Sequence, residues 1–153
     1  MLIEVKAKVA WIIDNKVRKR TETYILDKNV FAEAEYEVMT LLSGYMDEGT
    51  VKSFEILMIK VSMVKEIITQ YQGENTFIAS LRDIFLQEDG TEKTIKYKVL
   101  LWANNISDAM THTREIASQG YDMQIDSLRE VDYVYLTTQR NEESTESTNS
   151  SED

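Results

Sequence analysis

The sequence predicts an α+β fold built from two ββαβ repeats, with about six strands and two main helices in one compact domain. Three observations support this. Each half of the chain opens on alternating apolar and polar residues, continues with an apolar pattern of helical spacing, and closes on a β-favouring run, at residues 50–64 and 125–138. Matching the two helices gives an offset of 75 residues, and matching Val51 with Ile125 gives 74. We therefore expect an internal duplication.

The first repeat opens on the clearest strand of the chain. Residues 3–11 alternate between apolar and mostly charged side chains, which predicts a strand with one buried face. Residues 14–16, Asp-Asn-Lys, provide turn chemistry, and residues 17–26 return as the second strand of a β-hairpin. A helix with its apolar residues on one face follows over residues 31–45, and we expect Asn29 to cap it.

The closing run of the first repeat is apolar at both parities of a strand. We therefore expect residues 50–64 to be buried on both faces, in the middle of a sheet. Residues 65–72 are expected to form a short helical or irregular linker.

The second repeat follows the same order. Residues 77–86 and 94–103 predict two strands, and Glu-Asp-Gly at 88–90 is a strong hairpin signal between them. Asn104 or Asn105 is expected to cap the second helix. The apolar pattern predicts a core that includes Trp11, Phe31, Val38, Leu41, Phe54, Ile56, Phe85, Ile106 and Leu128.

The domain boundaries follow from these elements. We expect one domain over residues 1–138, with repeat one at 1–68, a linker at 69–75 and repeat two at 76–138. Residues 139–153 are expected to be a disordered acidic tail, because they are rich in Ser and Thr, hold five carboxylate side chains and have no apolar side chain to bury. The tail either keeps the protein soluble or acts as an electrostatic mimic that competes with nucleic acid or docks on a partner.

The composition excludes several kinds of catalytic site. The chain has no cysteine and one histidine, which removes Cys-His nucleophiles, zinc fingers and histidine metal clusters. That histidine, His112, is expected at the surface of the second helix or at its boundary with the core. The five glycines are isolated, so there is no phosphate-binding loop. Carboxylates such as Asp122 and Asp126 remain for a metal site, but no catalytic constellation is present, and we expect a non-enzymatic protein without metal or cofactor.

The absence of cysteine also favours a reducing compartment. The first residues carry charges at Glu4, Lys6 and Lys8, so neither a signal peptide nor a membrane span is expected. We therefore expect a cytoplasmic protein with no membrane partner.

Three stretches resemble a known family. Residues 21–27, Thr-Glu-Thr-Tyr-Ile-Leu-Asp, and residues 31–35, Phe-Ala-Glu-Ala-Glu, look like the most recognisable part of an uncharacterised family of small duplicated ββαβ proteins from gut anaerobic bacteria and their phages. Residues 106–109 are similar to the start of that family's second helix, whereas Lys28 stands where the family has a small residue. The resemblance covers residues 1–138. It implies the fold and a phage or mobile-element setting in a bacterial host, and it transfers no catalytic residue.

Basic residues gather on the two predicted hairpins. If the helices cover one face of the strands, the other face would be basic and would carry aromatic rings, so that cations pair with phosphates and rings stack on bases. The alternative is that these are ordinary solvent-facing strand residues. The candidate nucleic-acid-binding residues are Lys6, Lys8, Lys16, Arg18, Lys19, Arg20, Tyr24, Lys96 and Lys98.

Three functions fit the sequence. The first is single-stranded nucleic-acid binding by a phage or mobile-element accessory protein. The second is a protein-binding adaptor or an inhibitor of a host factor, which uses a strand edge or the acidic helix face. The third is a small-ligand binder with its site between the repeats. We rank nucleic acid first and expect a monomer or a homodimer.

Overall fold

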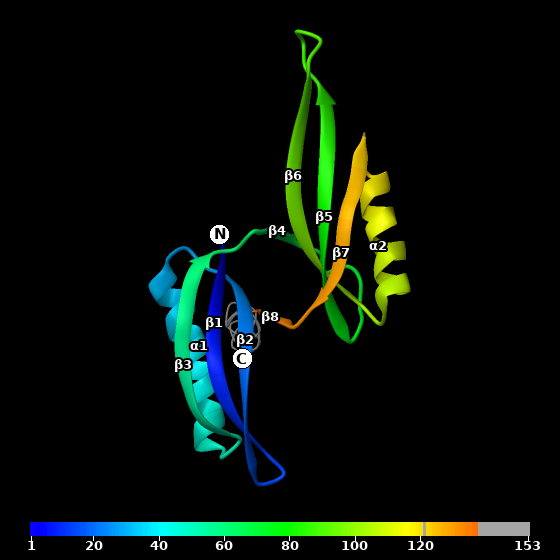
Figure 1. Ribbon diagram of the computed structural model, residues 1–153. Helices are drawn as coiled ribbons and strands as arrows, with labels where there is room; N and C mark the ends of the chain where they lie inside the picture. Colours follow the sequence, from blue (N-terminus) through cyan, green and yellow to red (C-terminus); the bar gives the residue numbers. More distant parts are fainter. Residues whose placement is uncertain (121, 138–153) are drawn as a thin grey trace, which may run out of the picture. The chain divides into compact units, whose positions relative to one another are not determined.

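The computed structural model describes residues 1–120 and 122–137, so the predicted acidic tail lies outside the described residues. The described part is an α+β structure of eight strands in two sheets and two helices (Figure 1). It divides into two compact units, Met1–Ser62 together with the strand Tyr133–Leu136, and Met63–Asp132. The predicted fold class is confirmed, with eight strands in place of about six.

The first unit is a four-stranded sheet with one helix. It contains β1 (Leu2–Ile13), β2 (Lys16–Asp27), α1 (Phe31–Asp47), β3 (Val51–Val61) and β8 (Tyr133–Leu136). The strand order is β3-β1-β2-β8, antiparallel except for the parallel pair of β2 and β8. Asp14 and Asn15 connect β1 to β2 with φ angles of 52° and 64°. Two successive positive φ values match the twist of a tight hairpin, so the first predicted hairpin is confirmed.

The second unit has the same plan. It contains β4 (Val64–Ile67), β5 (Asn75–Leu86), β6 (Glu92–Ala103), α2 (Ile106–Ser118) and β7 (Met123–Val131). The strand order is β4-β6-β5-β7, with only the pair of β4 and β6 parallel. Gly90 lies between β5 and β6 with φ 87°, a conformation that side chains with a Cβ rarely adopt. The second predicted hairpin is therefore confirmed.

The two helices begin differently. Asn105 Oδ1 accepts a 2.8 Å hydrogen bond from the backbone N–H of Asp108, and Asp108 Oδ2 accepts one of 3.1 Å from the N–H of Asn104. This pair confirms the predicted cap at Asn105. At α1 the N-cap is Val30, which makes no side-chain cap bond, so the prediction that Asn29 caps the first helix is wrong.

A β-bulge explains why residues 50–64 are apolar at both parities. Met58 pairs with Lys6 and Ile56 pairs with the next residue of β1, so Leu57 is the extra residue of the bulge. Because of this extra residue, even-numbered residues face the helix just before the bulge and odd-numbered residues face it after the bulge. Ile56 and Ile59 therefore both pack against the core. Because β3 is an edge strand and ends at residue 61, the prediction of a central strand over residues 50–64 is wrong.

The second sheet carries a bulge at the corresponding place. In β7, Asp126 is the extra residue between Ile125 and Ser127. Ile125 and Ile56 hold the same position beside their bulges, so Ile125 corresponds to Ile56, and the predicted match with Val51 is wrong. The helices differ in length, with 17 residues in α1 and 13 in α2, and this extra turn shifts the alignment of everything that follows.

Each repeat ends on a short strand that joins the sheet of the other repeat. β4 follows β3 after Ser62 and Met63 and pairs with β6, whereas β8 follows β7 after Asp132 and pairs with β2. The linker predicted at 65–72 therefore begins as a strand. The single strand predicted at 125–138 is two strands in two different sheets.

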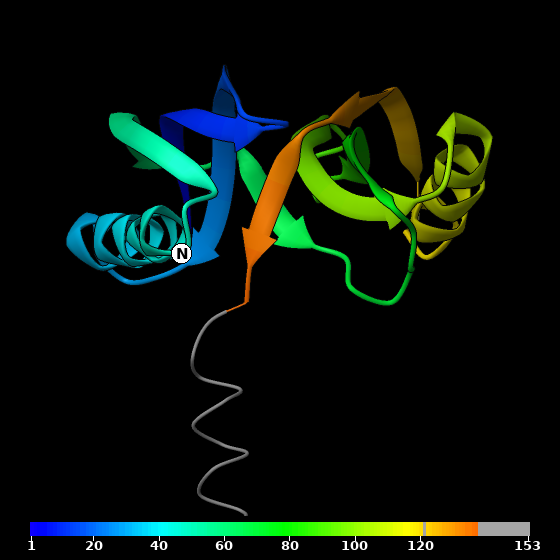
Figure 2. The same cartoon turned by 90° about the horizontal axis from the view of Figure 1, so that it is seen from below.

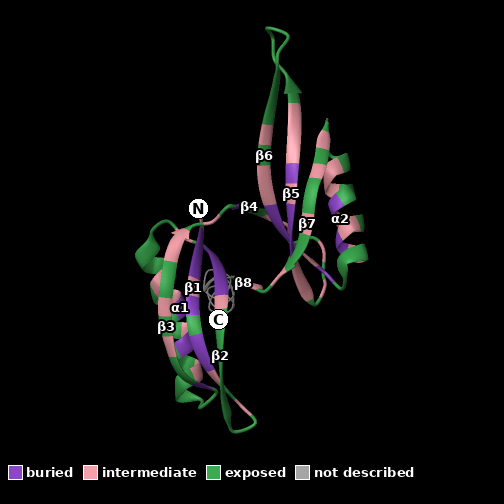
Figure 3. Ribbon diagram, viewed as in Figure 1, coloured by how far each residue is buried: buried purple, intermediate pink, exposed green. Residues whose placement is uncertain are grey.

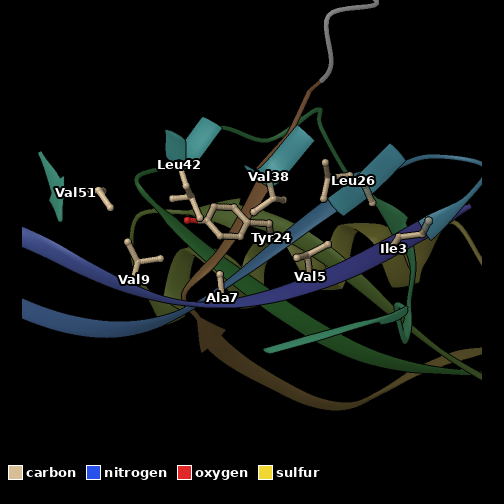
Figure 4. Packing of buried hydrophobic residues seen from close by; sticks show 10 residues of the cluster. Ile3, Val5, Ala7, Val9, Tyr24, Leu26, Val38, Leu42 and Val51 are labelled. Carbon is tan, nitrogen blue, oxygen red and sulfur yellow. The ribbon is translucent and has the colours of Figure 1, made fainter. Parts of the chain in front are cut away.

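One face of the first sheet packs on α1 (Figure 2). Alternate residues of β1 point toward the helix, and Val5 and Val9 face Val38 and Leu42 across the gap (Figure 4). Burial of such a side chain stabilises the fold by about 1.5–3 kcal/mol. The buried residues of this core are Ile3, Val5, Ala7, Val9, Tyr24, Leu26, Ala34, Val38, Leu42 and Val51.

The second sheet packs on α2 in the same way. Its buried residues are Phe77, Ala79, Leu81, Val99, Leu101, Ala103 and Ala109.

The predicted core is confirmed in part. Val38 is fully buried, and the partly buried residues that pack against the two cores include Trp11, Leu41, Phe54, Ile56 and Leu128. Phe31, Phe85 and Ile106 are exposed, so their prediction is wrong. Phe31 and Ile106 are the first residues of their helices, and Phe85 lies near the end of β5, beyond the rows of buried residues.

Candidate functional site

Three predicted basic residues share the face of the first sheet that is turned away from α1. Lys6 and Lys8 alternate along β1 with the buried residues that face α1. Lys19 pairs with Ala10, which lies on the same face of β1 as Lys8 because it is two residues further along the strand. Residues paired directly across two strands point to the same face. Lys8 and Lys19 are exposed there, and Lys6 is half-buried.

Lys8 and Lys19 border a hollow of about 300 Å³ on this face. Ser53 and Glu55 of β3 also line it, and Glu55 pairs directly with Lys8 across the strands. The hollow therefore brings together two ammonium groups and one carboxylate, an arrangement that leaves a small excess of positive charge.

The other basic residues of the first hairpin have the opposite parity. Arg18 pairs with Trp11 and Arg20 with Val9, and Lys16 has the same parity at the hairpin end. All three cations are exposed. The six predicted cations of this hairpin are thus divided between two faces of the sheet.

On the second sheet, Lys96 and Lys98 have the parity opposite to that of the core residues of β6. Lys96 is exposed and Lys98 is half-buried. Lys96 pairs with Arg82, whose guanidinium lies 3.3 Å from Asp126 Oδ1 and donates a 2.8 Å hydrogen bond to Gln124 Oε1. Arg82 is therefore partly neutralised by β7.

Tyr24 belongs to the core of the first unit. Only 2% of it is exposed, and its hydroxyl donates a hydrogen bond to Glu22. Burial first, and then the Glu22 carboxylate, raise the pKa of Tyr24. A ring in this position has no face open to a base, so the prediction that Tyr24 binds nucleic acid is wrong.

Trp11 also donates a hydrogen bond to the Glu22 carboxylate. Its indole Nε1 donates a 2.6 Å hydrogen bond to Glu22 Oε1, and its ring centroid lies 5.6 Å from that of Tyr45 on α1. Trp11 therefore also packs on the helix side of the sheet and not on the face that carries Lys8.

The outer face of α1 carries an exposed stripe that was not predicted from the sequence. Figure 3 shows that α1 has both exposed and buried stretches. Five residues recur on this helix at alternating spacings of four and three, and all five are exposed. This is the spacing at which one helix packs along another. We name this set the α1 seam; it consists of Ala32, Tyr36, Met39, Ser43 and Met46.

Two hollows border the α1 seam. One, of about 510 Å³, is lined by Lys28, Ala32, Glu33, Tyr36, Glu37, Thr40 and Leu41. The other, of about 500 Å³, is lined by Tyr36, Met39, Thr40, Ser43, Gly44 and Asp47. Tyr36 and Thr40 line both hollows, so the two border each other along the helix.

The charge of α1 has one sign. The helix contains Glu33, Glu35, Glu37 and Asp47 and no lysine or arginine. Lys28, before the helix, places its Nζ 3.6 Å from Glu37 Oε2. The α1 seam is therefore a stripe of four apolar or aromatic residues and one serine, with acidic flanks.

The one histidine of the chain lies on α2. Its ring stacks on Tyr71, with centroids 4.1 Å apart and planes at 9°, and its Nε2 lies 3.3 Å from Asp108 Oδ1. The His112 side chain is half-buried, at the boundary position expected for it. Burial raises the pKa of the Tyr71 hydroxyl. These contacts fix the segment after β4 against the helix.

Residues 1–120 and 122–137 contain no group of three or more His, Asp or Glu that could hold a metal ion. No helix within these ranges is long and apolar enough to cross a membrane.

Neither the curated proteins nor the solved structures include a match to the chain. One family model matches residues 3–138, and the resemblance to an uncharacterised family is confirmed. The chain belongs to the family described as a domain of unknown function, DUF4494.

Proposed function

We propose that the protein is a non-enzymatic protein-binding module whose α1 seam docks an amphipathic helix with basic flanks. The observation that carries this proposal is Tyr36. It is 73% exposed on α1 and borders both hollows. Exposed aromatic side chains beside hollows are typical of the residues that supply most of the binding energy at an interface.

The shape of the surface favours a helical partner. The α1 seam has the alternating spacing at which side chains of a second helix insert between those of the first. Gly44 lines one hollow, and nothing lies within 4 Å of the place where its Cβ would be. A partner backbone can therefore approach α1 closely at this point.

The charge decides between two occupants. Two copies of α1 packed against each other would bring carboxylates together on both sides of the seam, since the helix has four acidic residues and no basic one. Like charges facing each other disfavour such a pair. A helix with lysine or arginine beside its apolar stripe complements the same surface.

Calorimetric titration tests this docking. The probe is a Leu/Lys amphipathic helical peptide of about 20 residues, long enough to span α1, and a Leu/Glu peptide of the same pattern is the charge control. We expect the Leu/Lys peptide to bind and the Leu/Glu peptide not to bind.

A pair of variants locates the binding site. Tyr36→Ser should weaken the affinity by about tenfold or more, as expected for an exposed aromatic residue that borders both hollows. Leu86→Ser, on β5, is the matched control because Leu86 is equally exposed, at 77%, and should bind like the unchanged protein. Equal binding by the two variants would remove the α1 seam as the site.

A specific observation also favours single-stranded nucleic acid as a second candidate ligand. Lys8 and Lys19 border a hollow on the face away from α1, and phosphates would pair there with the two ammonium groups. Lys8→Glu with Lys19→Glu should therefore weaken the binding of a labelled oligonucleotide, measured by fluorescence anisotropy. Arg18→Glu with Arg20→Glu is the matched control, because these cations have the opposite parity. Equal losses in both pairs would mean that no defined face binds the strand.

The remaining expectations stay predictions. They are a small ligand between the repeats, a phage or mobile-element setting, and a cytoplasmic location.

A further inference from the structure

The edge of β2 is a strand-acceptor site. Four residues of β2 pair in parallel with the four residues of β8. These four residues of β2 are buried: Thr23, Tyr24, Ile25 and Leu26. If β8 left, backbone N–H and C=O groups of this stretch would lose their strand partners, and the β2 edge of the sheet would be uncovered. The edge of β2 is therefore the place where a donated strand completes the first sheet.

The strand that fills it comes from the other repeat. β8 continues from β7, which is an edge strand of the second sheet, and Asp132 is the one residue between them. In the reciprocal direction, β4 continues from β3 and fills the edge of β6. Neither repeat completes its own sheet, and the strand that completes each sheet is joined to its own repeat by a connection of one or two residues.

We infer that β2 accepts residues 133–136 from a second copy of this chain as well as from its own, giving a closed strand-exchanged dimer. The hydrogen bonds and packing between β2 and β8 are the same whichever chain supplies the strand, so the two forms differ only at the connection. Two acceptor sites and two donor strands leave neither β2 edge unfilled, which closes the assembly with twofold symmetry.

The short connection favours exchange. Short hinge segments are typical of strand exchange, whereas longer links favour closure within one chain. Asp132 is such a hinge. A dimer of this kind would also carry two α1 seams, so that a partner with two helices would bind it more tightly than it binds one chain.

Mixed single-cysteine variants detect the exchanged strand directly. Because the chain has no cysteine, only the introduced thiols react. Thr23 pairs directly with Tyr133, so a Thr23→Cys chain refolded at high concentration with a Tyr133→Cys chain should form a disulfide-linked heterodimer. Thr23→Cys mixed with Leu86→Cys gives the background, because Leu86 is exposed and lies in the other sheet. We expect the first mixture to exceed this background severalfold.

Both variants in one chain test the geometry of the pair. If that double variant closes its own disulfide while the mixture stays at background, the inference is overturned. If the double variant does not close its disulfide, the test is the molar mass of the unchanged protein, measured by light scattering after refolding at rising concentration. A dimer that becomes rarer when Gly-Ser-Gly is inserted after Asp132 supports the exchange. A monomer at every concentration overturns it.

Discussion

Trp11 and Glu22 are joined by a 2.6 Å hydrogen bond from the indole Nε1 to Oε1, and Tyr24 donates its hydroxyl to the other oxygen of the same carboxylate. One side chain thus satisfies two donors at the helix-covered face of the first sheet. Glu22→Ala leaves both donors without an acceptor, and we expect it to lower the free energy of unfolding by about 2–4 kcal/mol.

Glu22→Gln is the control for this prediction. The amide keeps one acceptor oxygen for two donors, so its loss should be about half that of the alanine variant. Urea unfolding followed by tryptophan fluorescence measures both. A loss below about 0.5 kcal/mol for Glu22→Ala would contradict the structural role of this carboxylate.

The raised pKa of Tyr24 predicts a loss of stability in alkali. The folded protein keeps the hydroxyl proton that the unfolded chain releases above its ordinary pKa of 10.0. The stabilisation is therefore complete below that pH and falls as the pH rises above it, by up to about 1.4 kcal/mol per pH unit. The slope should be smaller in Tyr24→Phe, which has no proton to lose. The free energy of unfolding of both proteins would be measured by urea unfolding between about pH 10 and pH 11. An equal fall with pH in the unchanged protein and in Tyr24→Phe would contradict this prediction.

Gly44 predicts opposite effects on stability and on docking. It lies inside α1, where glycine costs about 1 kcal/mol relative to alanine, and a Cβ there meets nothing within 4 Å. Gly44→Ala should therefore raise the free energy of unfolding by about 0.5–1 kcal/mol. The same methyl group would occupy the hollow beside Tyr36 and weaken peptide binding. An affinity that is unchanged in the stabilised variant would mean that no partner approaches α1 at this point.

Gly73 is the contrasting glycine. A Cβ at this position would clash with the backbone carbon of Ala103, which belongs to the end of β6. The backbone would have to move, so we expect Gly73→Ala to destabilise the protein by about 1–3 kcal/mol. Thermal unfolding of the Gly73 and Gly44 variants side by side checks the prediction. A higher melting temperature for Gly73→Ala would contradict the close approach.

Local chemistry made much of the fold predictable. The turn residues at Asp14, Asn15 and Gly90 adopt the positive φ angles that their types allow, and the alternation of residues 3–11 matches the buried face of β1. The cap at Asn105 was predictable for the same reason. In each case the residues that determine the structure are neighbours in sequence.

Longer-range features were not predictable in this way. An apolar strand with a bulge at Leu57 has the same pattern as a strand buried on both faces, so its place at the sheet edge could not be read from parity. The residues of β4 and β8 favour strands, but they do not indicate which of the two sheets each strand joins. Parity alone places Lys19 on the face opposite to Arg18 and Arg20. Which of these cations share a face with Lys6 and Lys8 depends on the register with β1, which the sequence does not give.

The candidate site had a sequence signal of its own. Residues 32, 36, 39, 43 and 46 follow the spacing of a helix-packing stripe, but the core stripe of the same helix has helical spacing too. Only burial separates the two stripes, since Ala34, Val38 and Leu42 are buried and the α1 seam is exposed.

Chemical-shift mapping tests the docking surface most directly. The backbone amides of the intact protein would be followed while the Leu/Lys peptide is added. We expect the largest shifts at Ala32, Tyr36, Met39 and Gly44, with the second unit little affected. Shifts confined to the strands, or an unchanged spectrum at a saturating concentration of peptide, would contradict the assignment of the α1 seam as a protein-binding surface.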